Sequence, residues 1–202
     1  MKKQNLLSLI ACTFFIYLAF ACTVHKKLWC DSMDANVKAD EETENFILFN
    51  DGNKIAGEKI AFKSGTLTKD VIMIDKDKYP IAETRGFKSN GIFFGRYKNT
   101  YAKRIIKGKI NIYYREIIKH GTSTNASGQT RSTINVDCLF YYQVGDTGII
   151  EEFYKYKTIR QLIQSCPAAA AMMDKPDKEI RKMVKANAKF LNSVFETYNA
   201  CK

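Results

Sequence analysis

Short apolar runs alternate with turn-forming residues through the middle of this chain, which is the pattern of antiparallel β-strands. Residues 46–49 are largely apolar, Asp51 and Gly52 follow, and the chain returns through residues 54–62. Because Asp-Gly tolerates the positive φ angles of a tight turn, this stretch predicts a β-hairpin.

The later part of this region predicts further strands. Asn90 and Gly91 predict a second tight turn. In residues 109–115 polar and apolar side chains alternate, as in a strand with one face in solvent. Residues 119–132 are polar without periodicity and predict a loop. The predicted strands are residues 46–49, 54–62, 71–74, 78–83, 92–97, 109–115, 134–142 and 149–154.

The C-terminal part changes to the period of helices. Thr158 is a candidate cap of one helix, and Pro167 suits the first turn of a short alanine-rich helix. Asp177 is a candidate N-cap for the longest helix, whose apolar positions recur on one face as far as Tyr198.

Strands followed by helices predict an α+β fold. We expect an antiparallel β-rich domain, a sandwich or a small barrel, over residues 45–156. A helical C-terminal segment, residues 157–202, is expected to pack on it.

The first residues predict export. Lys2 and Lys3 precede fifteen uncharged residues, 6–20, which is short for a bilayer span but suits the apolar region of a signal peptide. Ala19 and Ala21 supply the small residues that a signal peptidase reads. We therefore predict a signal peptide over residues 1–21, with an uncleaved N-terminal anchor as the alternative.

Cys22 follows directly and predicts a lipid anchor. Residues 18–22 resemble a loose bacterial lipobox, in which the cysteine receives diacylglycerol and becomes the mature N-terminus. Free secretion is the alternative. Residues 22–44 are polar and patternless and predict a tether. No acidic run directly follows Cys22, which favours a periplasm-facing position in the cell envelope.

The chain is basic, with a formal net charge of +11 that includes only two lysines from the predicted signal peptide. Such a charge favours anionic surroundings. Nucleic acid is scarce in an envelope and is not an expected partner. The expected partners are the membrane surface, reached through the lipid anchor, and an acidic glycan or another envelope protein.

The densest basic stretch is residues 96–119, in which eight cations face one acid and tyrosines are interleaved. Alternation favours a solvated outer strand face whose lysine stems cover apolar surface. The alternative is a face that holds acidic glycans or headgroups. The candidate anion-binding residues are Arg96, Lys98, Lys103, Arg104, Lys107, Lys109, Tyr113 and Arg115.

The cysteines carry no redox or zinc motif, since the chain has no C-x-x-C. Four cysteines besides Cys22 lie beyond the predicted signal peptide, namely Cys30, Cys138, Cys166 and Cys201, which suits either disulfides of unknown pairing or buried thiols. With two histidines in the chain, a histidine-rich metal site is not expected.

An enzyme would have to be assembled from scattered residues. A thiol enzyme could combine Cys138 and His120 with Asp137 or Asp146 as the orienting acid. However, Cys138 falls on the apolar face of its strand, where an inert thiol is expected. We predict no catalytic residue, no metal and no cofactor.

Three segments together resemble a family: FNDGNKIAG at 49–57, SNGIFF at 89–94 and AKRIIKGKINIY at 102–113. With the signal and its lipobox, they resemble small uncharacterised exported proteins and lipoproteins of Bacteroidota. The resemblance implies export and a β-rich domain that ends in helices, and it implies no activity and no site residue. The sequence therefore predicts a non-enzymatic binding or structural module of the cell envelope. Polyanion binding through residues 96–119 and, less favoured, a thiol enzyme or hydrolase are the alternatives.

Overall fold

A computed structural model describes residues 43–63, 70–125, 127–153, 155–187 and 189–202. The predicted signal peptide, Cys22 and nearly all of the predicted tether lie outside these residues. The strands are β1 (Asn45–Phe49), β2 (Lys54–Gly57), β3 (Ile60–Lys63), β4 (Val71–Ile74), β5 (Asp77–Pro80), β6 (Thr84–Ser89), β7 (Ile92–Tyr97), β8 (Thr100–Ile106), β9 (Ile110–Thr124), β10 (Thr130–Val144) and β11 (Glu151–Glu152). The helices are η1 (Ile81–Glu83), α2 (Tyr156–Ile163), α3 (Pro167–Met173), α4 (Asp177–Ala186) and α5 (Phe190–Ala200).

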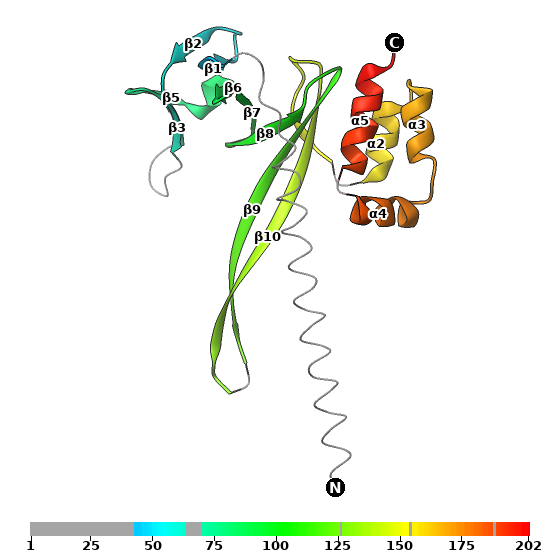
Figure 1. The fold of residues 1–202 in the computed structure, drawn as a ribbon. Coiled ribbons are helices and arrows are strands. Elements are labelled where there is room, and N and C mark those ends of the chain that lie inside the picture. Colours follow the sequence, from blue (N-terminus) through cyan, green and yellow to red (C-terminus); the bar gives the residue numbers. More distant parts are fainter. Residues whose placement is uncertain (1–42, 64–69, 126, 154, 188) are drawn as a thin grey trace. The chain divides into compact units, whose positions relative to one another are not determined.

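The strands form two antiparallel sheets, and four α-helices follow them, so the predicted α+β class is confirmed (Figure 1). One sheet has eight strands in the order β11-β10-β9-β8-β7-β6-β1-β2, and the other has the order β3-β4-β5. The large sheet is not closed into a barrel, so the barrel form of the prediction is wrong.

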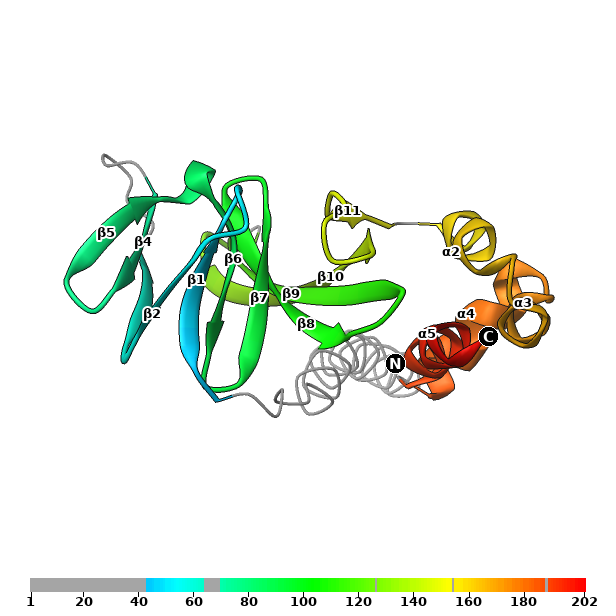
Figure 2. The same ribbon diagram turned by 90° about the horizontal axis from the view of Figure 1, so that it is seen from above.

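The small sheet packs on one face of the large sheet, as in a sandwich. The shared core joins Ile72 and Ile74 of β4 to Ile47 of β1, Phe87 of β6 and Tyr101 of β8. Burying such large apolar side chains stabilises the fold by about 1.5–3 kcal/mol each. Figure 2 shows the small sheet at one end of the large sheet and the helices at the other.

Both predicted tight turns are confirmed. Gly52 has a φ of 91°, Asn90 a φ of 52° and Gly91 a φ of 75°. The predicted single strand 54–62 is wrong, because it divides between β2 in one sheet and β3 in the other. The Asp75 carboxylate accepts the N–H of Lys59 at 2.9 Å just after this division, so a distant acid stabilises the change of sheet.

Residues 116–138 belong to a different compact unit from the rest of the described fold, and their strands correct the predicted loop 119–132. Here β9 continues to Thr124 and β10 begins at Thr130, so these residues are mostly paired strand. The Thr133 hydroxyl donates to the Gly121 carbonyl at 3.1 Å. The polar composition of residues 119–132 predicts a loop, but several of them are threonines, which favour strands because threonine is β-branched.

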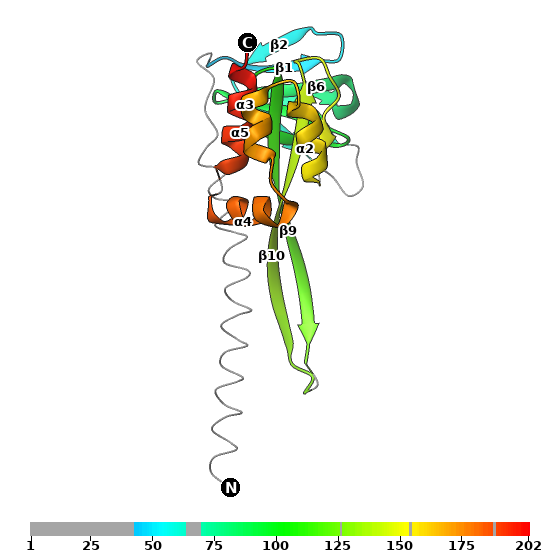
Figure 3. The ribbon, with the colours of Figure 1, turned by 90° about the vertical axis from the view of Figure 1, so that its right-hand side faces the viewer.

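The helical part confirms one prediction and corrects three. Asp177 is the first residue of α4, and Pro176 holds the N-cap position predicted for it. Pro167 is the first residue of α3, as predicted. Thr158 lies inside α2 and does not cap it. The predicted long helix is two helices, because the backbone at Asn187 is extended after α4. Figures 1 and 3 show α4 lying across the ends of α2, α3 and α5.

The break allows two short helices to bury separate apolar faces. Ile180 and Val184 are buried on α4, and Leu191, Val194 and Phe195 are buried on α5. In one straight helix these residues would all lie on a single face. Within the parts of the chain that the structure describes, no helix combines the length and the apolar character that crossing a bilayer requires.

α5 is joined to the large sheet by an asparagine that acts like a strand partner. The Asn199 side chain accepts the N–H of Ile110 at 2.9 Å and donates to the Ile110 carbonyl at 3.0 Å. A disulfide joins Cys166, before α3, to Cys201, after α5. The helices are therefore tied to the start of β9 and to one another.

Candidate anion-binding site on the sheet

The candidate site lies beside β7, and a glycine of this strand makes room for it. At Gly95 of β7, a Cβ atom would collide with the Ile150 side chain and would lie 2.7 Å from Cε1 of Tyr113. Both side chains are buried. The absence of a side chain at Gly95 therefore lets the segment around Ile150 lie directly on the sheet.

That segment, residues 145–152, forms one wall of the site and is held by a buried polar network. The Asn111 amide donates to the Gly145 carbonyl at 3.0 Å and to the Asp146 carboxylate at 3.1 Å. The Gln143 amide donates to the Gly148 carbonyl at 2.7 Å. Because these amides are buried and bonded, they fix the position of the wall.

Tyr113 completes this network. Its hydroxyl donates to Oε1 of Gln143 at 2.6 Å. Burial raises the pKa of Tyr113 to about 12, so its phenol remains a donor at neutral pH. On the outer wall, the hydrogen bond to Glu151 raises the pKa of Tyr142 to about 12.

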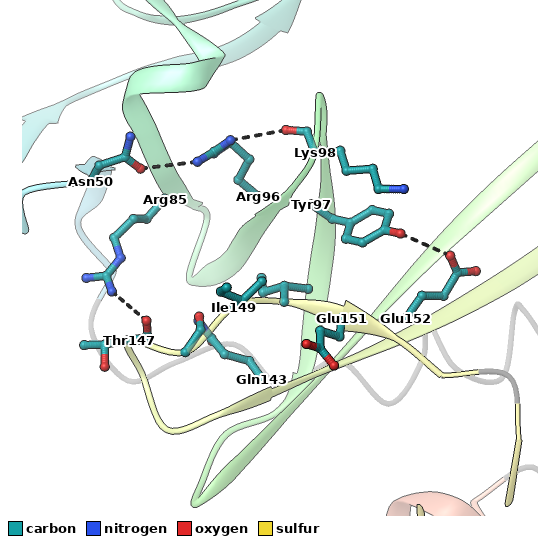
Figure 4. A pocket seen from close by; sticks show the side chains of 12 residues that line it. Asn50, Arg85, Arg96, Tyr97, Lys98, Gln143, Thr147, Ile149, Glu151 and Glu152 are labelled. Atoms are coloured by element: carbon teal, nitrogen blue, oxygen red, sulfur yellow. Dashed lines mark hydrogen bonds between the residues drawn. The ribbon is translucent and has the colours of Figure 1, made fainter. Parts of the chain in front are cut away.

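A pocket between β6, β7 and residues 143–152 has a volume of about 650 Å³ (Figure 4). Arg85 donates to the Thr147 carbonyl at 3.1 Å, which ties the β6 side of the pocket to residues 145–152. Arg96 donates to Oδ1 of Asn50 at 3.4 Å and to the carbonyl of Lys98 at 3.4 Å. The lining residues are Asn50, Arg85, Arg96, Tyr97, Lys98, Gln143, Thr147, Gly148, Ile149, Ile150, Glu151 and Glu152.

A smaller pocket of about 210 Å³ adjoins it, since both are lined by Arg85, Gln143 and Ile150. Its other lining residues are Phe46, Leu48, Lys54, Lys88, Phe93, Gly95, Arg104, Lys107, Tyr113 and Asp146. We call the two pockets together the basic groove.

Cations outnumber acids in the basic groove by seven to three. The cations are Lys54, Arg85, Lys88, Arg96, Lys98, Arg104 and Lys107, and the acids are Asp146, Glu151 and Glu152. Four of the cations lie over aromatic rings, and one of them is Lys88, whose ammonium is 6.0 Å from the Phe46 ring centroid. Lys54 is 4.4 Å from the Phe46 ring centroid, Arg104 is 4.6 Å from that of Phe93, and Lys98 is 5.1 Å from that of Tyr97. Such contacts hold the side chains in place without neutralising their charge.

Five of the eight candidate anion-binding residues meet in the groove, namely Arg96, Lys98, Arg104, Lys107 and Tyr113. Three line neither pocket. Lys109 donates to the Cys201 carbonyl, and the Lys103 ammonium lies 6.0 Å from the Tyr114 ring centroid. Arg115 is the third.

The predicted solvated outer face is wrong for the inner part of β9. Both faces of the strand are buried there, including Asn111 and Tyr113. The alternation of residues 109–115 suggested one exposed face, but residues 145–152 cover it.

Sequence reasoning missed Lys54, Arg85 and Lys88, and it also missed the covering segment. Arg85 lies where the pairing of β1 with β6 shifts register, because Leu48 pairs with Gly86 whereas Phe49 pairs with Thr84. A register shift of this kind redirects a side chain. No local pattern in the sequence marks it.

The thiol-enzyme alternative loses its nucleophile, because Cys138 is disulfide-bonded. Its proposed orienting acid Asp137 pairs with Lys119 at 2.7 Å. Among the described residues, no group of three or more histidine, cysteine or acidic side chains could hold a metal ion.

No protein-family model, no curated protein and no solved structure matches this chain.

Proposed function

We propose that this protein is an exported, lipid-anchored, non-enzymatic binding module of the bacterial cell envelope, and that it binds a polyanion in the basic groove. The observation that carries the proposal is the convergence of seven cations from β2, β6, β7, β8 and their turns against three carboxylates. The polyanion is an acidic glycan or a layer of anionic headgroups.

The cations of the groove are suited to this ligand. Arginine presents donors in a fork that matches a carboxylate or a phosphate. Arg85, Arg96 and Arg104 are partly buried, where an ion pair is screened less than at an open surface. Lys54 and Lys107 are exposed and would extend the contact along a chain of charges.

The disulfides support the export part of the proposal. Cys166 is bonded to Cys201, and Cys138 is also disulfide-bonded. Such bonds persist in oxidising compartments and are rare in the cytosol. Cys22 would supply the membrane anchor, in the way that Bacteroidota lipoproteins are anchored.

Polyanion binding in the groove is tested by replacing two of its exposed lysines. We expect Lys54→Gln combined with Lys107→Gln to weaken binding of polygalacturonate about tenfold, or about 1.4 kcal/mol, because two charge contacts are lost. Raising the salt from about 50 mM to about 200 mM should also weaken binding by the wild type, and by less in the variant. Isothermal titration calorimetry measures both effects.

The matched control is Lys178→Gln combined with Lys182→Gln on α4, which removes the same charge from exposed residues that line neither pocket. We expect less than a twofold change. Equal losses in the two variants would mean that net charge alone drives binding, and salt-independent binding would exclude the polyanion.

The anchor is tested by the intact mass of the protein purified from its native envelope. We expect a chain that begins at Cys22 and carries a diacylglycerol-sized increment, because the lipobox cysteine becomes the acylated N-terminus. A chain without the increment would replace the anchored module by a freely secreted one, and a chain that retains residues 1–21 would argue against cleavage.

A further inference from the structure

Two carboxylates line the larger pocket. Negative charge would weaken a surface that binds only polyanions, so these carboxylates need another explanation. Glu151 and Glu152 line the pocket together with Arg85, Arg96 and Lys98. From this pairing of opposite charges we infer that the larger pocket selects one chemical unit of the polyanion: a sugar residue that carries a carboxylate. The inference rests on the proposed function and names its ligand class.

The arginines remain available to an anion. Arg85 donates to the Thr147 carbonyl at 3.1 Å, which uses one of the five N–H donors of a guanidinium. Arg96 is held by the carbonyls of Thr84 and Lys98 and by the Asn50 amide oxygen. These partners are all uncharged, so they orient the guanidinium groups and leave their positive charge to a ligand.

The carboxylates are likewise bonded to neutral groups. Glu152 accepts the Tyr97 hydroxyl at 3.4 Å, and Glu151 accepts the Tyr142 hydroxyl. An ionised carboxylate has about four lone-pair positions, so each retains capacity to accept further hydroxyl donors. Their present partners are hydroxyl groups, which is the kind of donor that a sugar presents.

The two kinds of charge lie apart in the pocket. Figure 4 shows Arg85 and Arg96 on one side, Glu151 and Glu152 on the other, and Ile149 between them. A ligand that satisfies both sides must carry an acid at one end and hydrogen-bond donors at the other. A uronic acid has this arrangement, because its carboxylate and its ring hydroxyls project from one ring.

The apolar surface between the charges fits the same ligand. Ile149 is 81% exposed although it is a large apolar side chain on the pocket wall. A sugar ring has C–H groups that can cover such a surface and remove it from water. Polyphosphate offers neither C–H groups nor neutral hydroxyls.

The test asks whether one variant changes its affinities for two anions in opposite directions. We expect Glu151→Gln combined with Glu152→Gln to bind tetragalacturonate about fivefold more weakly, because charge-assisted hydrogen bonds to sugar hydroxyls become neutral ones. The same variant should bind polyphosphate more tightly, since two negative charges leave a basic pocket. Isothermal titration calorimetry on the full mature chain gives both dissociation constants.

The matched control is Glu179→Gln combined with Glu196→Gln, which removes two exposed carboxylates that line neither pocket. It should change both affinities by less than twofold. Neutral galactotetraose should bind at least tenfold more weakly than tetragalacturonate, because it lacks the acid for Arg85 and Arg96.

The outcomes separate this inference from the proposed function. If the double glutamine variant binds both anions more tightly, the sugar inference is wrong and polyanion binding stands. If glycerophosphoethanolamine binds as tightly as tetragalacturonate, the pocket takes a zwitterionic headgroup and the inference is again overturned. If neither anion binds to the wild type, the proposed function fails as well.

Discussion

Replacing Asn111 with aspartate is expected to lower the free energy of unfolding by about 3 kcal/mol or more. Asn111 is completely buried, and its amide donates to the Gly145 carbonyl and to the Asp146 carboxylate. Aspartate cannot donate to either group, and it places a second negative charge beside Asp146. The partly buried Gly145 carbonyl then loses this donor, which adds to the repulsion.

Urea denaturation followed by circular dichroism measures this effect. The matched control is Asn99→Asp in the exposed turn between β7 and β8, which should change stability by less than about 0.5 kcal/mol. Because Asn111 holds residues 145–152, the variant should also lose affinity for tetragalacturonate while it is still folded. A stability equal to that of the control would show that the buried network does not hold this wall.

Removing the Cys166–Cys201 disulfide is expected to lower the free energy of unfolding by about 3 kcal/mol. The bond closes a loop across a sequence separation of 35 residues, which contains α3, α4 and α5. Without it, the unfolded chain gains conformational freedom. The folded state also loses the direct link between the start of α3 and the end of α5.

The experiment compares wild type with Cys166→Ala combined with Cys201→Ala, so that Cys138 keeps its own disulfide. The midpoint of urea denaturation should fall, and the slope should rise, because the unfolded chain without the bond is less compact and exposes more surface. The matched control is Ala168→Ser combined with Ala200→Ser at neighbouring exposed positions. A double alanine variant as stable as the control would mean that packing around the buried helix residues holds the helices without the disulfide.

The local features of the fold were predictable because their causes are local. Asp51-Gly52 and Asn90-Gly91 form turns since both contain residues that tolerate positive φ. Pro167 begins α3 because a first helical residue needs no N–H partner. The order of strands before helices was enough to predict the α+β class.

The errors arose where a distant segment overrides a local pattern. The apolar positions from Ile180 to Tyr198 are compatible with one long helix, but α4 and α5 bury separate faces and the chain breaks at Asn187. Alternation in β9 suggested one solvent-exposed face, but residues 145–152 cover it.

The candidate site was predictable in part for the same reason. The basic stretch indicated Arg96, Lys98, Arg104, Lys107 and Tyr113, all of which line the groove. Its remaining cations lie far away in the sequence and come from other strands. Glu151 and Glu152 were not among the candidate residues, since nothing in the sequence shows that they line a pocket with Arg85 and Arg96.

The sequence by itself determined the turns, most of the strand and helix positions, and a cationic stretch beside an apolar core, because these depend on neighbours within a few residues. The tertiary structure decided which charges meet. The strand order places β1, β6, β7 and β8 next to one another, the register shift next to Arg85 redirects the chain, and the absence of a side chain at Gly95 lets Ile150 lie on the sheet. A groove depends on contacts between residues that are far apart along the chain, and those contacts form only when the whole sheet is assembled.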